Sequence, residues 1–238
     1  MEVKRPNPKI KSRVLDVMRF FAYMNQGHNS QRRITKLAYL SELMFLDKHY
    51  EPLTGARFIS YDYGVFSLDI ATAYDEIEAE CEDMKVVPRA TTHGDARSIQ
   101  PTQEKTIVHL DPERYCVISK TFDFLGYVRT DLIVRMSKRS SLFQKTKYAD
   151  PIDLVGYAQR REAAFRDLKG APVGTKIELP SLGYLWKVRV EDKGYSAECE
   201  DLSGCITQGD TFEELEENMR QAILGYLDCE AELRENAS

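Results

Sequence analysis

The spacing of apolar residues changes at residues 170–174, and this change constrains the fold more than any other feature of the chain. Before this point, apolar residues recur at the spacing of one face of an α-helix. After it, over residues 184–190, they alternate with polar residues as on a half-buried β-strand. The intervening Gly-Ala-Pro-Val-Gly is typical of a linker. We therefore expect a helical domain over residues 1–170 and a second domain over residues 175–238.

The sequence of the first domain, which we call the body, predicts a series of helices. Ser30 is a suitable N-cap for a helix over about residues 32–50, which is apolar on much of its circumference and should form the centre of the core. Ser67 predicts the start of another helix, which continues to about residue 82. Residues 86–108 favour a hairpin or a long loop. Further helices are expected over residues 11–25, 111–120, 122–137 and 151–168.

The second domain, the tail, predicts the order β-β-β-α. Two strands, residues 184–190 and 195–199, flank a turn at Lys193-Gly194, and a shorter strand covers about residues 205–207. Thr211 and Glu214 then form a capping box at the start of a helix. The whole chain is thus expected to be α+β, with a mostly helical body that contains a small hairpin and a sheet-and-helix tail.

Charge is distributed unevenly between the two domains. The formal net charge of the chain is −5, but residues 171–238 hold 6 basic and 15 acidic side chains, whereas residues 1–170 carry a net charge of +4. Two segments of the body, residues 1–36 and 129–147, are more basic still. Such asymmetry suggests a different partner for each domain.

The composition places the chain among ordinary folded proteins, with 42% apolar and 30% charged residues. No apolar run approaches the roughly 18 residues that a membrane span needs. The basic start, residues 1–6, lacks the apolar core of a signal peptide. We therefore expect a cytoplasmic chain with no membrane partner. Its five scattered cysteines should be free thiols.

No enzyme or cofactor motif is present. The four histidines show no ligand spacing, and Cys199 and Cys205 have no second cysteine pair, which argues against a structural zinc site. Residues 170–176 are too short for a phosphate-binding loop and reverse its Lys-Thr order. No nucleophile elbow of the form Gly-x-Ser-x-Gly occurs. We expect a protein without enzyme activity, with no catalytic residue, metal or cofactor.

The tail carries the most specific pattern in the chain. Residues 194–197 read GY-x-A, residues 201–214 read DL-x-GC-x-T-x-GDT-x-EE, and Asn218 and Ala222-Ile223 follow. This run closely resembles the HicB-like antitoxin domain, with Leu215 where that family usually has alanine. The resemblance implies a partial RNase-H-like fold without nuclease chemistry, which neutralises a small toxin, typically a basic RNA-cleaving protein, by binding it.

A tail of this size with three strands leaves open sheet edges and is only marginally stable alone. We therefore expect it to pair with the body, with a second copy in a homo-oligomer, or with the toxin. The tail sheet or its helix is the expected toxin-binding surface. Its candidate residues are Trp186, Tyr195, Glu198, Glu200, Asp201, Glu213 and Glu217.

The body shows a separate similarity, carried by residues 37–40 (LAYL), 55–58 (GARF) and 61–67 (YDYGVFS). These segments resemble the Panacea domain, also called SocA-like, although Val65 replaces the usual proline. The resemblance implies a largely helical antitoxin module that occurs beside many unrelated toxins and that, in one group, delivers a toxin to a protease. Together the two similarities predict an antitoxin of a type II toxin–antitoxin system.

Two other functions compete with this prediction. The first is a DNA-binding autoregulator or adaptor of such an operon, because a basic cluster with aromatic residues, here Phe143, Tyr148, Lys145 and Lys147, can follow a phosphate backbone. The second is a nuclease, if Glu198, Glu200, Asp201 and Asp210 converge to hold Mg²⁺. The candidate residues for operator DNA are Arg32, Arg33, Lys36, Arg135, Lys138 and Arg139.

Overall fold

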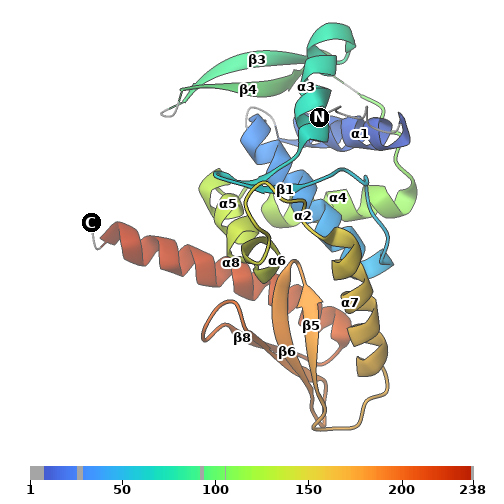
Figure 1. The fold of residues 1–238 in the computed structure, drawn as a ribbon, viewed down its shortest axis with the longest axis vertical. Coiled ribbons are helices and arrows are strands. Elements are labelled where there is room, and N and C mark those ends of the chain that lie inside the picture. The colour runs from blue at the N-terminus through green and yellow to red at the C-terminus, as the bar shows by residue number, and fades with distance from the viewer. Residues whose placement is uncertain (1–7, 26–28, 92–93, 105, 237–238) are drawn as a thin grey trace.

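A computed structural model describes residues 8–25, 29–91, 94–104 and 106–236, and its fold is α+β as expected (Figure 1). The basic start, residues 1–6, lies outside the described residues. The body contains two hairpins, β1 (Ile59–Tyr61) with β2 (Gly64–Phe66) and β3 (Met84–Thr91) with β4 (Gly94–Pro101). Its helices are α1 (Pro8–Met24), α2 (Gln31–His49), α3 (Leu68–Glu80), α4 (Pro112–Leu125), α5 (Thr130–Arg139), α6 (Ser141–Gln144) and α7 (Leu154–Leu168).

Helix α2 is the central core helix, as its sequence predicts. The Ser30 side chain accepts a hydrogen bond from the backbone N–H of Arg33 and caps the helix. Tyr50 ends it with a left-handed backbone, φ 57°. Most of its residues are buried, because α1, α4, α5 and α7 all pack around it.

The remaining body elements confirm the predicted caps but not every boundary. Ser67 caps α3, and β3 pairs with β4 as in the expected hairpin. The prediction of one helix over residues 122–137 is wrong, because the chain leaves α4 at Gly126 and re-enters helical geometry only at Thr130. The buried Arg33 guanidinium binds the carbonyl groups exposed by this break, as described below.

The tail is a four-stranded antiparallel sheet in the order β5-β6-β7-β8. Its strands are β5 (Lys176–Ser181), β6 (Tyr184–Val190), β7 (Tyr195–Cys199) and β8 (Ile206–Gly209), and α8 (Phe212–Asn236) lies against one face. The prediction of three strands is therefore wrong, since β5 was missed. Pro180 argues against a strand, but it is tolerated here because β5 is at the edge of the sheet.

Helix α8 begins as predicted. The Glu214 N–H donates to Thr211 Oγ1 at 3.1 Å, and the Glu214 carboxylate accepts from the Asp210 N–H at 3.0 Å. The buried stripe of the helix runs from Leu215 to Ala231. This stripe holds the helix against the sheet and, further along, against α5.

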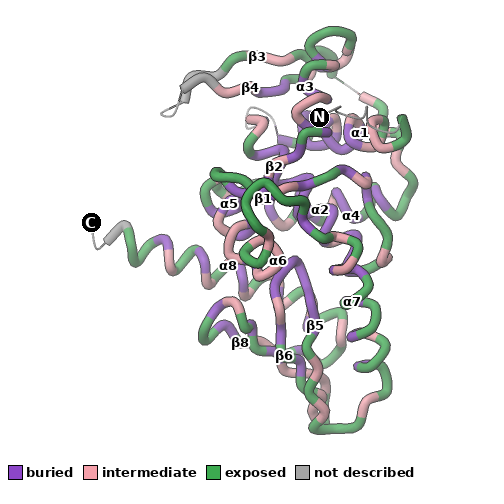
Figure 2. The backbone as a smooth tube through the Cα atoms, viewed as in Figure 1, coloured by how far each residue is buried: buried purple, intermediate pink, exposed green. Residues whose placement is uncertain are grey.

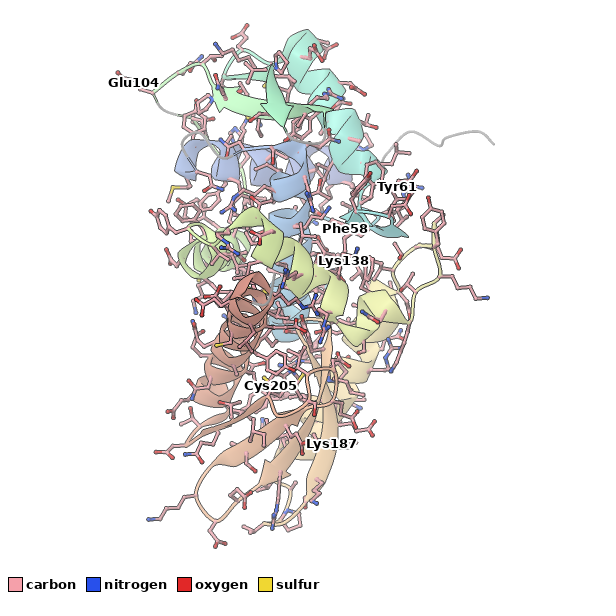
Figure 3. All side chains as sticks on the ribbon, turned by 90° about the vertical axis from the view of Figure 1, so that its left-hand side faces the viewer. Phe58, Tyr61, Glu104, Lys138, Lys187 and Cys205 are labelled. Atoms are coloured by element: carbon pink, nitrogen blue, oxygen red, sulfur yellow. The ribbon has the colours of Figure 1, made fainter. Side chains whose placement is uncertain are left out.

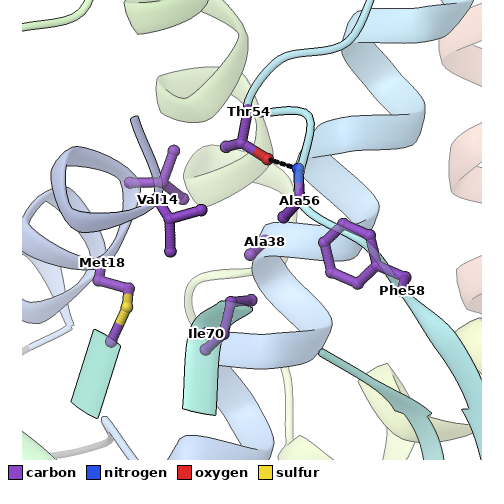
Figure 4. Close-up of a pocket in the computed structure, with 8 residues that line it drawn as sticks. Val14, Met18, Ala38, Thr54, Ala56, Phe58 and Ile70 are labelled. Atoms are coloured by element: carbon purple, nitrogen blue, oxygen red, sulfur yellow. Dashed lines mark hydrogen bonds between the residues drawn. The ribbon is translucent and has the colours of Figure 1, made fainter. Parts of the chain in front are cut away.

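A single hydrophobic core runs through both domains (Figure 2). Leu43 of α2, Leu182 of the β5–β6 turn and Trp186 of β6 belong to one continuous cluster of buried side chains. A small apolar gap between α1, α2 and α3, lined by Met18, Phe58 and other core residues, is shown in Figure 4. It is too narrow to admit a water molecule, and we assign it to core packing rather than to a ligand site.

Candidate partner-binding surfaces

The tail is anchored in the body by the turn between β5 and β6. Leu182 and Gly183 both have positive φ, 50° and 81°, as a two-residue type I′ hairpin turn requires. The Asp47 carboxylate of α2 accepts hydrogen bonds from the Leu182 N–H at 2.8 Å and the Ser181 hydroxyl at 3.2 Å. The Tyr157 hydroxyl donates to the same carboxylate. Because this turn is buried against α2, the sheet is fixed to the helical body.

Arg161 of α7 also joins the tail to the body, and only 1% of its surface is exposed. Its Nη1 donates to the carbonyl of Pro180 at 2.8 Å, and its Nε donates to the carbonyl of Asp47 at 3.2 Å. Its Nη2 forms an ion pair with Glu216 of α8. A buried guanidinium is costly unless its donors are satisfied, and these three contacts join α7, α2, β5 and α8.

One backbone carbonyl at each edge of the tail sheet accepts a hydrogen bond from a side chain. At the β8 edge, Asn218 Nδ2 donates to the carbonyl of Gln208 at 2.8 Å. At the β5 edge, the Pro180 carbonyl accepts from Arg161. Arg161 thus joins the β5 edge to α7, and Asn218 joins the β8 edge to α8.

The outer side of α8 is an acidic face. Its residues recur at helical spacing on the exposed side of the helix, and its C-terminal part projects beyond the sheet (Figure 1). Within the described part of the chain, only Glu217 among them has a cationic partner, Arg220, at 2.7 Å. We define the acidic face of α8 as Glu213, Glu214, Glu217, Asp228 and Glu232.

The predicted toxin-binding acids lie on two different sides of the tail. Glu213 and Glu217 belong to the acidic face of α8. Glu198 and Glu200 are exposed on strand β7 and at its end, and Glu200 pairs with Lys187 at 2.6 Å. Glu198 lies opposite Lys187 in the sheet register, on the face that α8 does not cover. The four acids therefore do not form one surface.

Two predicted contact residues are structural instead. Trp186 is completely buried in the hydrophobic core, so it cannot touch a partner. Asp201 accepts from the N–H groups of Ser141 at 2.8 Å and Leu185 at 3.2 Å, which ties the tail to the start of α6. Tyr195 is half-buried, with its ring packed edge-on against Phe212 of α8.

Two of the predicted DNA-binding cations are also internal. Arg33 is 4% exposed, and its guanidinium donates to the carbonyls of Leu125, Gly126 and Val128 between α4 and α5. Lys36 is equally buried, and its Nζ donates to the carbonyl of Val65 at 2.8 Å. Burial lowers the pKa of Lys36 to about 7, with further lowering from nearby cations. Neither side chain is available to a phosphate.

The other four predicted cations differ in their availability. Arg139 faces Glu230 of α8 at 3.5 Å. Lys138 donates from Nζ to the backbone carbonyl of Asp62 at 3.3 Å. Within the described residues, no carboxylate pairs with Arg32, Arg135 or Lys138. The predicted set is therefore reduced to Arg32, which is exposed, and to Arg135 and Lys138, which are half-buried.

Three exposed tyrosines form a group that the sequence did not reveal. Tyr148 was predicted in the basic cluster, but Tyr61 and Tyr63 were not predicted as site residues. The Tyr61 and Tyr148 rings stack with their centroids 5.2 Å apart and their planes at 21°. Tyr63, at the tip of the β1–β2 hairpin, is 69% exposed. The residues come from two distant segments, so no local pattern could have joined them. Asp228 and Glu232 of α8 were missed as well, although their helical spacing from Glu214 could have revealed them.

The acids proposed for a nuclease do not converge. Within residues 8–25, 29–91, 94–104 and 106–236, no group of three or more His, Cys, Asp or Glu side chains is arranged to hold a metal ion. Glu198, Glu200, Asp201 and Asp210 are all among these residues, which removes the geometric basis of that hypothesis. All five cysteines are free thiols, as expected. None of the described helices has the length and apolar character needed to cross a bilayer.

Comparison of the chain with protein-family models, with characterised proteins and with solved structures gives no match.

Proposed function

We propose that this chain is the antitoxin of a type II toxin–antitoxin system, which neutralises a basic, RNA-cleaving toxin by direct protein–protein binding. In this proposal the tail is a HicB-like domain with a partial RNase-H-like arrangement, and the body is a Panacea or SocA-like module. The tail pattern over residues 194–223 and the body pattern over residues 37–67 support the two assignments.

The observation that carries the proposal is the acidic face of α8. Four of its five carboxylates have no cationic partner among the described residues, and the helix extends them along one exposed side. A surface of one sign attracts a partner of the opposite sign and accelerates their encounter. A basic ribonuclease has the charge that fits this surface.

The exposed face of the sheet fits a basic partner less well. Its acids Glu178, Glu198 and Glu200 stand among Lys176, Lys187 and Arg189, so opposite charges largely cancel there. We therefore place the toxin-binding surface on α8 rather than on the sheet.

The proposal is tested by bacterial growth. The product of the gene beside this one is expressed alone and together with the full chain, and the chain should restore growth that this product arrests. Reversing two charges on the acidic face, Glu213→Lys with Asp228→Lys, should abolish rescue. The matched control, Glu178→Lys with Glu198→Lys, makes the same charge change on the sheet and should still rescue. Rescue by the α8 variant, or an adjacent product that is not toxic, would refute the proposal.

The alternative, an operator-binding autoregulator or adaptor, receives less support. Arg33 and Lys36 are buried, and Arg139 is paired, so the remaining cations do not supply the extended footprint that duplex DNA requires. A homo-oligomer remains part of the proposal and is measured by size-exclusion chromatography with light scattering.

A further inference from the structure

A second surface, on the body, combines exposed tyrosines with uncompensated cations. We call it the tyrosine patch and define it as Tyr61, Tyr63 and Tyr148 together with Lys138, Lys145 and Lys147 (Figure 3 labels Tyr61 and Lys138). It lies on the β1–β2 hairpin, on the end of α5 and on the loop between α6 and α7. The tyrosine patch and the acidic face of α8 share no residue.

The fold creates this patch by pairing two distant segments. The Ala149 N–H donates to the carbonyl of Ser60 at 2.8 Å, and the Ser60 N–H donates to the carbonyl of Asp150 at 3.1 Å. The α6–α7 loop therefore runs beside β1 like an additional short strand. This pairing sets the Tyr148 ring against the Tyr61 ring, and the Tyr148 hydroxyl reaches the Asp62 carboxylate at 3.4 Å.

Two lysines lie beneath the turn of the β1–β2 hairpin. Gly64, with φ 93°, leaves room for them, because a Cβ there would lie 3.0 Å from Lys138 Cγ and 3.6 Å from Lys36 Cε. Lys138 donates to the carbonyl of Asp62, and the buried Lys36 donates to the carbonyl of Val65. The hairpin that carries Tyr61 and Tyr63 is thus held by hydrogen bonds to two lysine side chains.

Among the described residues, the three lysines of the patch outnumber the two acids, Asp62 and Asp150, of the paired segments. No carboxylate forms an ion pair with the three lysines of the patch or with Arg32, which lies near Lys36. Asp62 and Asp150 are the acids on the two paired segments, and Asp62 already accepts from Tyr148. Repulsion from Arg32 and Lys138 adds to burial in lowering the pKa of Lys36, which agrees with an excess of cations here.

We propose that the tyrosine patch binds single-stranded nucleic acid, with bases stacked on Tyr63 and Tyr148 and phosphates held by Lys138, Lys145 and Lys147. Exposed aromatic rings beside cations are the elements by which proteins bind single strands without strong sequence preference. Tyr63 and Tyr148 are 69% and 59% exposed, so their rings are accessible to bases. A duplex hides its base faces inside the stack and would use only the cations. This proposal does not depend on the antitoxin proposal.

The test is fluorescence anisotropy of the full chain with a labelled oligo(dT) of about twelve nucleotides and with a duplex of equal length. We expect tighter binding of the single strand. Three phosphate contacts predict an affinity that falls about 20-fold between about 50 mM and about 200 mM salt. Removing both rings with Tyr63→Ala and Tyr148→Ala should weaken binding at least about fivefold for each ring.

Three controls separate stacking from other effects. Tyr148→Phe keeps the ring and should bind like the wild type, although it loses the hydrogen bond to Asp62. Tyr127→Ala removes a tyrosine that is 88% exposed between α4 and α5 and should change nothing. Lys145→Gln with Lys147→Gln should weaken binding and reduce its salt dependence.

Three results would overturn the proposal. One is the absence of binding at the lower salt concentration. Another is binding of the duplex as tight as that of the single strand, with the same affinities in the double tyrosine variant. This result would indicate a phosphate-binding surface for double-stranded DNA. The third is a double variant that binds the oligonucleotide normally but no longer binds the toxin, which would make the patch a protein-binding surface. None of these results alters the growth test of the acidic face.

Discussion

The helices α2 and α8 both carry many charged residues, but they use them in opposite ways. In α2, Arg33, Lys36, Glu42 and Asp47 are all less than 10% exposed. In α8, most acids face water. The difference follows from their surroundings, because α2 has packed elements on every side, whereas α8 is covered along one stripe only.

Each buried charge of α2 has a specific protein partner. The Glu42 carboxylate accepts from the backbone N–H of Thr54 at 3.0 Å and from its hydroxyl at 2.7 Å. Burial raises the pKa of Glu42 even though these hydrogen bonds oppose the shift. The comparison teaches that a charged residue indicates a binding surface only when the fold leaves it without an internal partner.

The largest expected effect is on Asp47, because its carboxylate joins α2, α7 and the β5–β6 turn. Asp47→Ala removes the acceptor of three buried donors, the Leu182 N–H and the Ser181 and Tyr157 hydroxyls, and the carboxylate 3.8 Å from the buried Arg161 Nε. It should cost about 3–5 kcal/mol of unfolding free energy. Urea unfolding measures this. Asp123→Ala, which removes an exposed acid on α4, serves as the control and should leave the urea midpoint unchanged. An Asp47→Ala midpoint equal to that of the control would contradict the claim that the Asp47 carboxylate holds the β5–β6 turn on α2.

The single tryptophan allows the same experiment to follow the tail separately. Trp186 fluorescence reports on the tail, whereas far-ultraviolet circular dichroism reports mainly on the helices. Because one core joins the two domains, both signals should change at the same urea concentration in the wild type. Two separate transitions would show that the domains unfold independently.

Replacement of the buried lysine should stabilise the protein in a pH-dependent way. The pKa of Lys36 is lowered from 10.5 in the unfolded chain to about 7 in the fold, so the unfolded state binds more protons between these values. Wild-type stability should therefore rise as the pH increases from about 7 towards 10.5. Lys36→Met avoids burying a charge and should be more stable by about 2 kcal/mol at pH 6, even after losing one hydrogen bond.

The advantage of Lys36→Met should shrink at pH 9, where the native lysine is mostly neutral. Thermal unfolding at both pH values measures the difference. Lys145→Met, at an exposed position, is the control and should show no such change with pH. A constant difference between Lys36→Met and the wild type at the two pH values would contradict a shifted Lys36.

A smaller effect is expected at the edge of the tail sheet. Asn218→Ala removes the hydrogen bond to the Gln208 carbonyl and should cost about 1 kcal/mol. It also exposes part of the β8 edge, so larger species should form at high concentration. Thermal unfolding and size-exclusion chromatography measure the two consequences. Gln221→Ala, on the exposed side of α8, is the matched amide control.

The smallest effect on stability is expected on the acidic face of α8. Glu213→Gln with Asp228→Gln removes two exposed charges that have no partner among the described residues, so the urea midpoint should not move. The same variant should bind a basic partner more weakly. A large loss of stability would show that these acids serve the fold, as the charges of α2 do.

Local signals predicted the elements whose ends are set by neighbouring residues. Ser30, Ser67 and Thr211 were identified as caps because an N-cap acts within its own turn. The β5 strand was missed, because its alternation of Ile177 and Leu179 is short and Pro180 is rare within strands. The burial of Arg33 and Lys36 depends on residues far along the chain, such as Val65 and Gly126, which no local pattern reveals. The same holds for the stacking of Tyr61 on Tyr148.

The central claim is that the exposed acids of α8 bind a basic protein partner. The most direct measurement is the association rate of the purified chain with the product of the adjacent gene, at increasing salt. We expect a rate that falls with salt, is strongly reduced by Glu213→Lys with Asp228→Lys, and is little changed by Glu178→Lys with Glu198→Lys. A rate that is independent of salt and equal in the wild type and the α8 variant would contradict the claim.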